Sequence, residues 1–590
     1  GIDWIPSLGL RLSFLVDGLS LLFALLITGI GAIILIYAGG YLAGDARLGR
    51  LYTLLLMFMG SMLGVVLAGN VLALFVFWEL TSLSSYLLIG FDHERAEARS
   101  AALQALLVTG AGGLALMAGL VLLGHAGVDA GIAAGDRFEL ASLLAAGDAV
   151  RDHALYLPIL VLVLAGAFTK SAQVPFHFWL PSAMEAPTPV SAYLHSATMV
   201  KAGIYLLARL SPVLGGTEAW LWSVTGFGAA TMLVGAVLAI GQYDLKRVLA
   251  YSTVSALGML TMLLGLGSAE AIAAAMTFLL AHALYKGALF LVAGSVDHGA
   301  GTRHLENLSG LARKMPITTA AALAAAASMA SLPPLFGFIA KELLLEATLD
   351  GPWNEVITGL SVFASMLFVA IAIVLGVKPF FGTATEHARK AHEVGLSLWL
   401  GPIVLGALCI AFGILPHYVD GPLLARAVQA VLTLDAPTPL KLALWHGWND
   451  ALALSILALV GGGIAYTVRR WVRIPSALAK RGPAWWYELA LAALNFTARW
   501  QTAVLQSGYL RRYLLTVLVA VASVLIYAIA TRLDTYPELD WNDVLFHEAV
   551  IVALIAIAPF ATVHARSRLS AIAGLGGVGY GVALLFVLYG

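Results

Sequence analysis

Lysine, glutamate and histidine residues recur inside long apolar segments of the sequence. An ionisable side chain in the interior of a bilayer is unfavourable unless it is paired or hydrated, so such residues are by default candidates for function. Their side chains can take up and release protons, and a path for protons is therefore the chemistry that they suggest. The candidate residues are Glu79, Lys170, His177, His195, Lys201, Lys246, His282, Lys286 and Lys341.

Several of these residues could work together. Burial disfavours the charged form of a lysine or a glutamate, whereas a nearby opposite charge favours it. Pairing or separating Glu79 and Lys170 would therefore change whether the lysine keeps its proton. Histidines such as His195 and His282 can relay protons between lysines through water, because an unperturbed imidazole titrates close to neutral pH. His282 and Lys286 are four residues apart, a spacing that places them on one face of a helix.

Structural roles are the alternative for each candidate. Lys246 stands beside Arg247 at an expected cytoplasmic helix end, where an anchoring role is as plausible as a relay role. Lys201 could extend its ammonium group toward the interface. Placement in the middle of the membrane favours a functional role for Glu79, Lys170, His282, Lys286 and Lys341.

Motifs for bond-making chemistry are missing from the sequence. It contains no nucleophile elbow, Walker motif or His-Glu-x-x-His metal-binding motif. A single cysteine, Cys409, excludes internal disulfide bonds and iron–sulfur clusters bound by cysteines. The 33 Lys and Arg residues balance 33 Asp and Glu residues, so the overall charge does not suggest a nucleic-acid partner. We therefore expect a transporter subunit rather than an enzyme, with no cofactor and no nucleic-acid partner.

The elements that position these residues are expected to be membrane-spanning helices. The 590 residues are 61% hydrophobic and only 11% charged, and the mean hydropathy is +0.91. Apolar runs long enough to cross a bilayer predict about sixteen spans. These runs begin near Phe14, Leu51, Val71, Ala101, Leu155, Ser191, Leu221, Val248, Ala271, Ile317, Val356, Leu398, Ala451, Leu514, Glu548 and Ala571.

Charged residues between the spans form two alternating sets. One set is basic and comprises Arg47, Arg50, Arg95, Arg99, Lys246, Arg247, Arg303, Arg313, Lys314, Lys378, Arg389, Lys390, Arg469, Arg470, Arg473, Lys480 and Arg481. The other is acidic and comprises Asp129, Asp136, Glu139, Asp148, Asp152, Glu218, Glu342, Glu346, Asp350, Asp534, Glu538, Asp540 and Asp543. Because cytoplasmic loops carry an excess of Lys and Arg, we expect the basic set in the cytoplasm and Gly1 outside.

Proline-rich segments interrupt two of the predicted helices. The first follows Lys170 and extends over residues 171–189, and the second covers 332–337 and leads to Lys341. They occupy corresponding places in two blocks of about five helices, residues 51–209 and 221–376, which is the pattern of a transporter repeat with its ion path at the repeat interface. We expect the second break to be a short non-helical segment that faces protein and water. The alternative is that the prolines only kink packed helices.

A different pattern lies between the last predicted spans. Apolar residues recur at spacings of three and four from Trp485 through Phe496 and Trp500 to Val504, opposite a polar face. This pattern predicts an amphipathic helix that lies on the cytoplasmic surface of the membrane. Anchoring in lipid and packing along other helices are both compatible with it.

Six stretches of sequence carry a family resemblance. They are 77–90 (FWELTSLSSYLLIG), 170–175 (KSAQVP), 179–181 (WLP), 186–192 (APTPVSA), 195–203 (HSATMVKAG) and 244–253 (DLKRVLAYST). They resemble the antiporter-like membrane subunits shared by Mrp antiporters and respiratory complex I, over residues 14–415. The resemblance implies an all-α polytopic fold with two inverted five-helix repeats, each with a broken helix. It matches Glu79 and Lys170 to the ion-pair gate of the family, Lys246 to its central lysine, and Lys341 to its exit lysine, with His195 and His282 as relay histidines.

Within the family, several features favour a resemblance to the A-type subunit of Mrp antiporters over the complex I relative. The glycines of 109–114 (TGAGGL) stand where the largest complex I relative has an acid. The A-type subunit is also favoured by His177, by 445–448 (WHGW) and by the surface helix. We expect an N-terminal span at 1–50 without two preceding family helices, repeats at 51–209 and 210–376, and accessory spans at 377–470. A cytoplasmic linker with the surface helix would occupy 471–512. The C-terminal spans would occupy 513–590, and the last of them would end within a helix.

The resemblance implies a proton-translocating subunit of a multi-subunit Na⁺/H⁺ antiporter. Its partners would be the other membrane subunits of that complex, Na⁺, H⁺ and the lipid of the cell inner membrane. There are three alternatives. The chain could be a component of a redox-driven pump or membrane hydrogenase, a membrane partner for inorganic-carbon uptake, or a scaffold without transport. A scaffold without transport is disfavoured, because it would not need a series of buried lysines.

Overall fold

The chain is almost entirely helical. Its structure, a computed structural model, describes residues 1–590 apart from 6–8, 352, 441, 446, 470–481, 507, 533–543 and 590. A small two-stranded antiparallel sheet of β1 (Ile2–Ile5) and β2 (Leu10–Leu12) precedes the helices. The described residues form two compact units, Gly1–Leu489 and Ala490–Gly590. Predicted features that lie outside the described residues are His446, Arg470, Arg473, Lys480, Arg481, Asp534, Glu538, Asp540 and Asp543.

Fourteen helical stretches of the described chain are long and apolar enough to cross a membrane. Twelve are single helices: α1 (Gly18–Tyr41), α2 (Leu48–Leu67), α3 (Val71–Ile89), α4 (Ala96–Asp129), α13 (Leu245–Leu266), α14 (Ala269–Ala300), α17 (Asn354–Gly376), α19 (Leu396–Ile414), α22 (Asp450–Val468), α25 (Leu510–Arg532), α26 (Phe546–Val563) and α27 (Arg568–Tyr589). The other two join α9 (Thr188–Ser196) to α10 (Ala202–Leu214), and α11 (Glu218–Trp220) to α12 (Gly226–Ile240).

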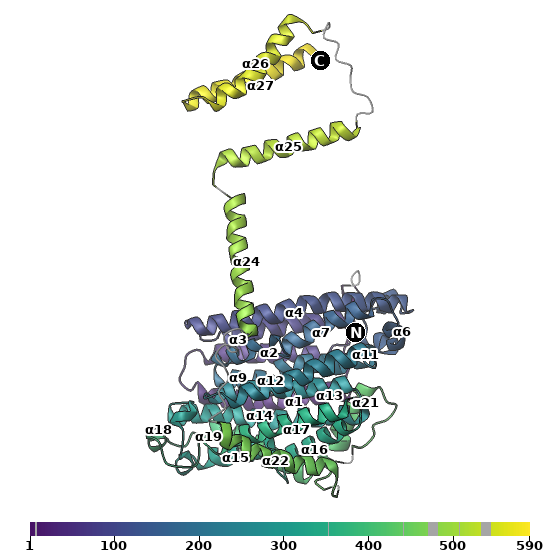
Figure 1. The fold of residues 1–590 in the computed structure, drawn as a ribbon, viewed down its shortest axis with the longest axis vertical. Coiled ribbons are helices and arrows are strands. Elements are labelled where there is room, and N and C mark those ends of the chain that lie inside the picture. The colour runs from purple at the N-terminus through teal and green to yellow at the C-terminus, as the bar shows by residue number, and fades with distance from the viewer. Residues whose placement is uncertain are drawn as a thin grey trace. The chain divides into compact units, whose positions relative to one another are not determined.

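Two shorter apolar helices, α7 (Tyr156–Lys170) and α15 (Pro316–Met329), complete the set. Every predicted apolar run therefore coincides with a helical stretch, and the prediction of a multi-pass all-α membrane protein is confirmed. Within the first unit the long helices lie side by side (Figure 1). The remaining helices are α5 (Leu140–Ala145), α6 (Gly147–Arg151), α8 (Trp179–Ser182), α16 (Phe336–Leu349), α18 (Glu386–Lys390), α20 (His417–Val419), α21 (Ala425–Leu432) and α24 (Pro483–Leu505).

Helix α14 lies at the centre of the first unit. The Ser268 side chain caps its first turn by accepting a hydrogen bond from Ala271 N at 3.1 Å, and Gly301 ends it in a left-handed conformation with φ +70°. Its whole apolar span is buried, because α9, α13, α15, α16 and α19 surround it. A helix enclosed by protein can carry ionisable residues that a lipid-facing helix would exclude.

The first break begins with a turn that closes the end of α7. Ala172 adopts the left-handed conformation with φ +48°, and Gln173 N donates a hydrogen bond to Phe168 O at 2.8 Å. This is the pattern of a Schellman motif, which satisfies the carbonyl groups at a helix end. A cis peptide bond precedes Pro175, and the chain continues through short helical turns to α9.

The second break repeats this backbone pattern after α15. Ser331 has φ +59°, Leu332 N donates to Ala327 O at 3.0 Å, and a cis peptide bond precedes Pro334. Each of these positions lies 159 residues after its counterpart in the first break. Four spanning stretches separate α7 from α15, so the two interrupted helices run in opposite directions across the membrane. The predicted pair of broken helices in inverted positions is confirmed.

The second break is a short non-helical segment between Met329, where α15 ends, and Phe336, where α16 begins, as predicted. Leu332, Pro333 and Pro334 are exposed at the surface of the chain. A turn within the break satisfies part of its backbone, as in the hydrogen bond from Leu335 N to Leu332 O at 3.0 Å. That water or other protein faces this segment stays a prediction.

Glu342 departs from its predicted position. The alternating charge pattern assigned it to an outer loop, but α16 extends to Leu349 and places Glu342 inside the helix, where only 9% of its surface is exposed. Its carboxylate accepts a hydrogen bond from the Ser455 hydroxyl of α22. The helix therefore continues further along the acidic segment than charge alone indicates.

The predicted amphipathic helix is present as α24. Its first turns pack against the first break, where the rings of Tyr487 and Phe178 are 5.5 Å apart. The position of the rest of α24 along the membrane surface stays a prediction. In the second unit, α26 and α27 pack closely because Gly574 and Gly581 leave room for Thr562 and Ile555.

Candidate proton path

Lys170 is the last residue of α7 and is fully buried. Its ammonium group donates hydrogen bonds to the Ser82 hydroxyl at 2.8 Å and to Trp78 O at 3.3 Å, both on α3. The Trp78 ring lies 5.2 Å from Lys170 Nζ, close enough for a cation–π contact. Two neutral oxygens and one aromatic face therefore hold this lysine inside the membrane.

Glu79 lies beside this group on α3 and is half-buried. Lys170 contacts Trp78, the residue before Glu79, so α3 and α7 bring the two side chains into the same region. However, the ion pairs formed by the described residues do not include these two side chains, and Glu79 Oε1 has no hydrogen-bond partner there. The sequence could not show this separation, because it depends on the rotamers of two long side chains.

Glycines of α4 create the space for Glu79. A β-carbon at Gly113 would overlap the Glu79 carboxylate, and one at Gly112 would overlap the Thr169 hydroxyl on α7. Helices α3, α4 and α7 can therefore approach closely around the Glu79 and Lys170 side chains.

A second group of candidates meets around α14. Lys286 Nζ donates to the Ser252 hydroxyl of α13 at 2.7 Å, and Lys201 Nζ donates to Leu279 O at 3.2 Å. His282 lies one turn before Lys286, and neither of its ring nitrogens has a partner among the residues described. Lys201, His282 and Lys286 are fully buried. We call these three residues the central cluster.

Lys246 marks the end of the path that is expected to face the cytoplasm. Only 2% of its surface is exposed, and its ammonium group donates to Ala186 O at 2.6 Å, near the end of the first break. Asp244 caps α13 through Lys246 N and accepts a hydrogen bond from Arg303 Nε at 2.6 Å. Lys246 is buried and hydrogen-bonded to the first break, which are not the features of a surface anchor.

His177 and His195 occupy the first break and the helix that follows it. His195 is fully buried on α9, and its ring centre lies 6.0 Å from that of Phe290 on α14. His177 is 6% exposed. In the described part of the chain, neither ring nitrogen of His195 has a hydrogen-bond partner. The same is true of Nδ1 of His177.

Lys341 lies in the second turn of α16, beyond the second break. It is 6% exposed, and its ammonium group contacts no hydrogen-bond acceptor of the described chain. A small cavity of about 20 Å³ adjoins it, lined in part by Tyr285, Ser328 and Ser365. The candidates thus extend from α3 and α7, through α9, α13 and α14, to α16.

Sequence reasoning missed the hydroxyl groups that hold the lysines. Ser82 and Ser252 accept the hydrogen bonds of Lys170 and Lys286, and Tyr285 lines the cavity beside Lys341. Ser82 lies three residues after Glu79, which offered a weak signal. Hydroxyls in membrane helices usually bond to their own backbone, so most of them give no indication of such a role.

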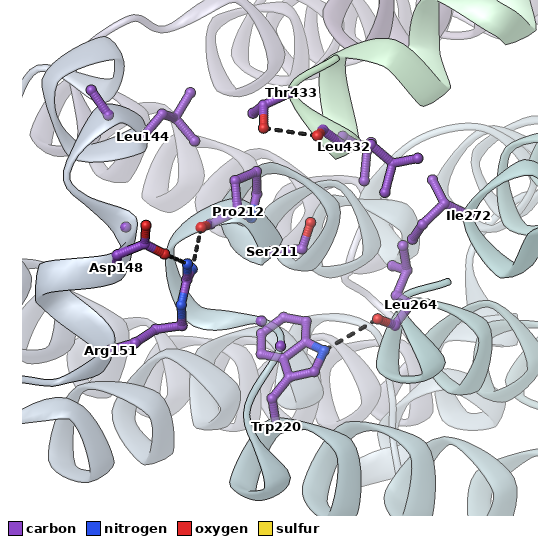
Figure 2. Close-up of a pocket in the computed structure, with 16 residues that line it drawn as sticks. Leu144, Asp148, Arg151, Ser211, Pro212, Trp220, Leu264, Ile272, Leu432 and Thr433 are labelled. Atoms are coloured by element: carbon purple, nitrogen blue, oxygen red, sulfur yellow. Dashed lines mark hydrogen bonds and ion pairs between the residues drawn. The ribbon is translucent and has the colours of Figure 1, made fainter. Parts of the chain in front are cut away.

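A polar hollow of about 440 Å³ lies elsewhere, among loops of the set expected to face outside (Figure 2). Arg151 points across it, pairs with Asp148 and donates a hydrogen bond to Pro212 O at 2.5 Å. Trp220 Nε1 donates to Leu264 O at 3.2 Å on its other side. Members of the candidate series do not line this hollow, so it is separate from the path.

A membrane helix bundle that is interrupted twice, in inverted positions and with the same backbone pattern, has the architecture of a secondary transporter. The chain belongs to the family of membrane proteins shared by NADH:quinone oxidoreductases and Mrp antiporters. The family model described as "NADH:quinone oxidoreductase/Mrp antiporter, TM" matches residues 68–368. The model described as "NADH-Ubiquinone oxidoreductase (complex I), chain 5 N-terminus" matches residues 4–52.

Individual relatives are similar over most of the chain. The A-type subunit of a Na⁺/H⁺ antiporter from Alkalihalophilus pseudofirmus is 40% identical over all of this chain and 76% of its own length. A probable A/B-type subunit of a K⁺/H⁺ antiporter from Rhizobium meliloti is 47% identical over 82% of this chain and 48% of its own length. A chain in the Mrp complex of Dietzia sp. has a TM-score of 0.85 and 36% identity, over all of this chain and 63% of that one. The chain therefore spans about half to two thirds of the length of two of these relatives.

Proposed function

We propose that the chain is the proton-translocating part of the A-type subunit of a cation/proton antiporter complex in the cell inner membrane. In this proposal, residues 51–209 and 210–376 are the two repeats, and proton movement between Glu79, Lys170 and Lys341 drives the export of Na⁺. The central cluster, Lys246, His177 and His195 carry the proton between them. Other membrane subunits of the complex are the partners. The names of the Alkalihalophilus and Dietzia proteins support the antiporter and the complex.

The observation that carries this proposal is the nature of the groups that bind the lysines. Lys170, Lys201, Lys246 and Lys286 all donate to neutral hydroxyl or carbonyl oxygens. A neutral amine still donates to such acceptors, so these lysines can lose a proton and keep a hydrogen bond.

Arg209 on α10 provides the contrast. It is 2% exposed and is bound by the Asp17 carboxylate, with Arg209 Nη2 and Asp17 Oδ1 2.8 Å apart. A guanidinium group does not release its proton in proteins, and the pair joins α10 to the start of α1. Its role is structural, whereas the lysines are bound in a way that permits proton exchange.

Cation exchange in inverted membrane vesicles tests the function. The complete complex, expressed in a strain without its own antiporters, is expected to dissipate a proton gradient when NaCl is added. The Rhizobium relative is named for K⁺, so KCl is the second cation to compare. A faster response to KCl would make K⁺ the substrate. An assembled complex that responds to neither salt would contradict the proposal, and copurified iron–sulfur subunits would favour a redox-driven pump.

The orientation in the membrane can be measured with single cysteines. The native Cys409 is fully buried and gives little background. Arg313→Cys, in an exposed basic loop, is expected to react with a membrane-impermeant maleimide only in inverted vesicles. Asp148→Cys, on the acidic side, is the matched control and is expected to react only in intact cells or spheroplasts. The reverse pattern would invalidate the assignment of Gly1 to the outside.

A further inference from the structure

Tyr285 on α14 differs from the other fully buried tyrosines. Tyr37, Tyr193 and Tyr205 each donate a hydrogen bond of 2.9 Å to a backbone carbonyl oxygen of another helix. The Tyr285 hydroxyl is also buried, with 2% of the residue exposed, but it has no hydrogen-bond partner among the described residues. An unsatisfied buried hydroxyl is unfavourable, so the surroundings of this one call for an explanation.

Tyr285 lines the cavity beside Lys341, which has room for a hydrogen-bond partner. Its volume of about 20 Å³ is sufficient for a water molecule. The polar residues that line it are Tyr285, Ser328, Ser331, Lys341 and Ser365. Two of these, Tyr285 and Lys341, have unpartnered polar atoms in the described chain, so a water here would satisfy both.

The ring of Tyr285 lies next to the central cluster. It packs edge-on against His282, with the ring centres 5.5 Å apart. Lys286 Nζ is 5.9 Å from the centre of the same ring. Tyr285 is therefore in contact with the central cluster and also lines the cavity beside Lys341.

We propose that the Tyr285 hydroxyl and a water in this cavity pass protons between the central cluster and Lys341. The phenolic oxygen accepts a proton from a hydrated group of the cluster and releases its own proton to the water, which protonates Lys341. Rotation of the hydroxyl then restores the starting state, so Tyr285 undergoes no net change. This inference rests on the proposed antiport function, and it adds Tyr285 to the residues that carry the proton.

The test compares Tyr285→Phe with Tyr193→Phe in the complete complex, at equal protein levels in inverted vesicles. Tyr285→Phe keeps the ring against His282 and removes only the hydroxyl. We expect the exchange rate to fall about tenfold, less than after loss of a lysine, because water can bridge part of the gap. Tyr193→Phe also removes one buried hydroxyl, but its partner is Ile27 O, so we expect an unchanged exchange rate.

Thermal unfolding and the solvent isotope effect separate a relay from a structural role. Tyr193→Phe should lower the midpoint of unfolding, because it leaves Ile27 O without its donor. Tyr285→Phe should lower it less, because it leaves no protein group of the described chain without a partner. If proton transfer becomes limiting in Tyr285→Phe, the ratio of exchange rates in H₂O and D₂O should rise above that of the unmodified complex.

Two results would overturn the inference. One is normal exchange by Tyr285→Phe, and the other is a slower rate that follows only reduced stability or assembly. Lys341→Ala distinguishes these from failure of the proposed function. If Lys341→Ala is inactive while Tyr285→Phe is normal, only the role of Tyr285 is wrong. If Lys341→Ala also exchanges normally, the proposed proton path itself is wrong.

Discussion

Lys170→Ala and Glu79→Ala are each expected to abolish cation/proton exchange while the complex still assembles. The rate should fall at least about a hundredfold, the lower end of what a positioned proton-transfer group contributes. The Lys170 ammonium is bound by Ser82 and Trp78 O rather than by a salt bridge to Glu79. We infer that Lys170 can release its proton in this arrangement, and that movement of Glu79 toward Lys170 would favour the charged form again.

Further variants of the pair test whether the two residues serve one step. Glu79→Asp should retain part of the exchange, because the charge remains on a shorter side chain. The double mutant should be no slower than either single mutant, since both lose the same step. Glu97→Ala, in the first turn of α4 and exposed, is the matched control and should exchange normally.

Rates are compared at equal levels of assembled complex in inverted vesicles. Near-normal exchange by either alanine variant would exclude a gate at this position. Loss of assembly would instead show that Glu79 and Lys170 have a structural role.

Lys286→Met is the second change with a large expected effect. Methionine has a similar length and no proton to give, so exchange should again fall at least about a hundredfold. The structural effect should be small, because the partner of Lys286 is the Ser252 hydroxyl rather than a carboxylate. Ser252 also donates to Leu249 O at 3.0 Å and therefore keeps a hydrogen bond in the variant. Breaking a pair of opposite buried charges would be much more destabilising.

Lys314→Met provides the comparison for Lys286→Met, since Lys314 is exposed in a loop expected to face the cytoplasm. It should leave exchange unchanged. Thermal unfolding of the purified complex should show similar midpoints for both variants. A Lys286→Met complex with normal exchange would remove the central cluster from the path, and an unfolded one would show that the lysine stabilises the fold.

The proline positions and the apolar runs were sufficient to predict the helices and both breaks. Pro175 and Pro334 cannot donate a backbone hydrogen bond, and this local property disfavours a continuous helix. Single prolines such as Pro212 and Pro402 nevertheless lie inside helices, so the clustering of prolines was the stronger signal. The ends of helices were harder to place. Glu342 lies within α16 although its acidic neighbours suggested a loop, because the contact with Ser455 depends on the packing of α22.

The buried ionisable residues were predictable as a set, but their partners were not. Lys246 is next to Arg247 and therefore looked partly like an anchor, yet the fold brings Ala186 O to its ammonium group. Likewise, the acceptors Ser82 and Ser252 become visible only when α7 meets α3 and α14 meets α13. Such contacts join residues far apart in the sequence, so local patterns carry little information about them.

The enclosed position of α14 has a consequence for biosynthesis. Its neighbours α15, α16 and α19 follow it in the chain, so the ribosome produces α14 before part of its protein environment exists. Released alone into lipid, it would expose Lys286 and His282 to hydrocarbon, which is unfavourable. We therefore expect α14 to stay at the translocation channel, or against α13, until the later helices arrive. The segment from α13 to α19 is in this sense one unit of membrane integration, rather than a series of helices inserted one at a time.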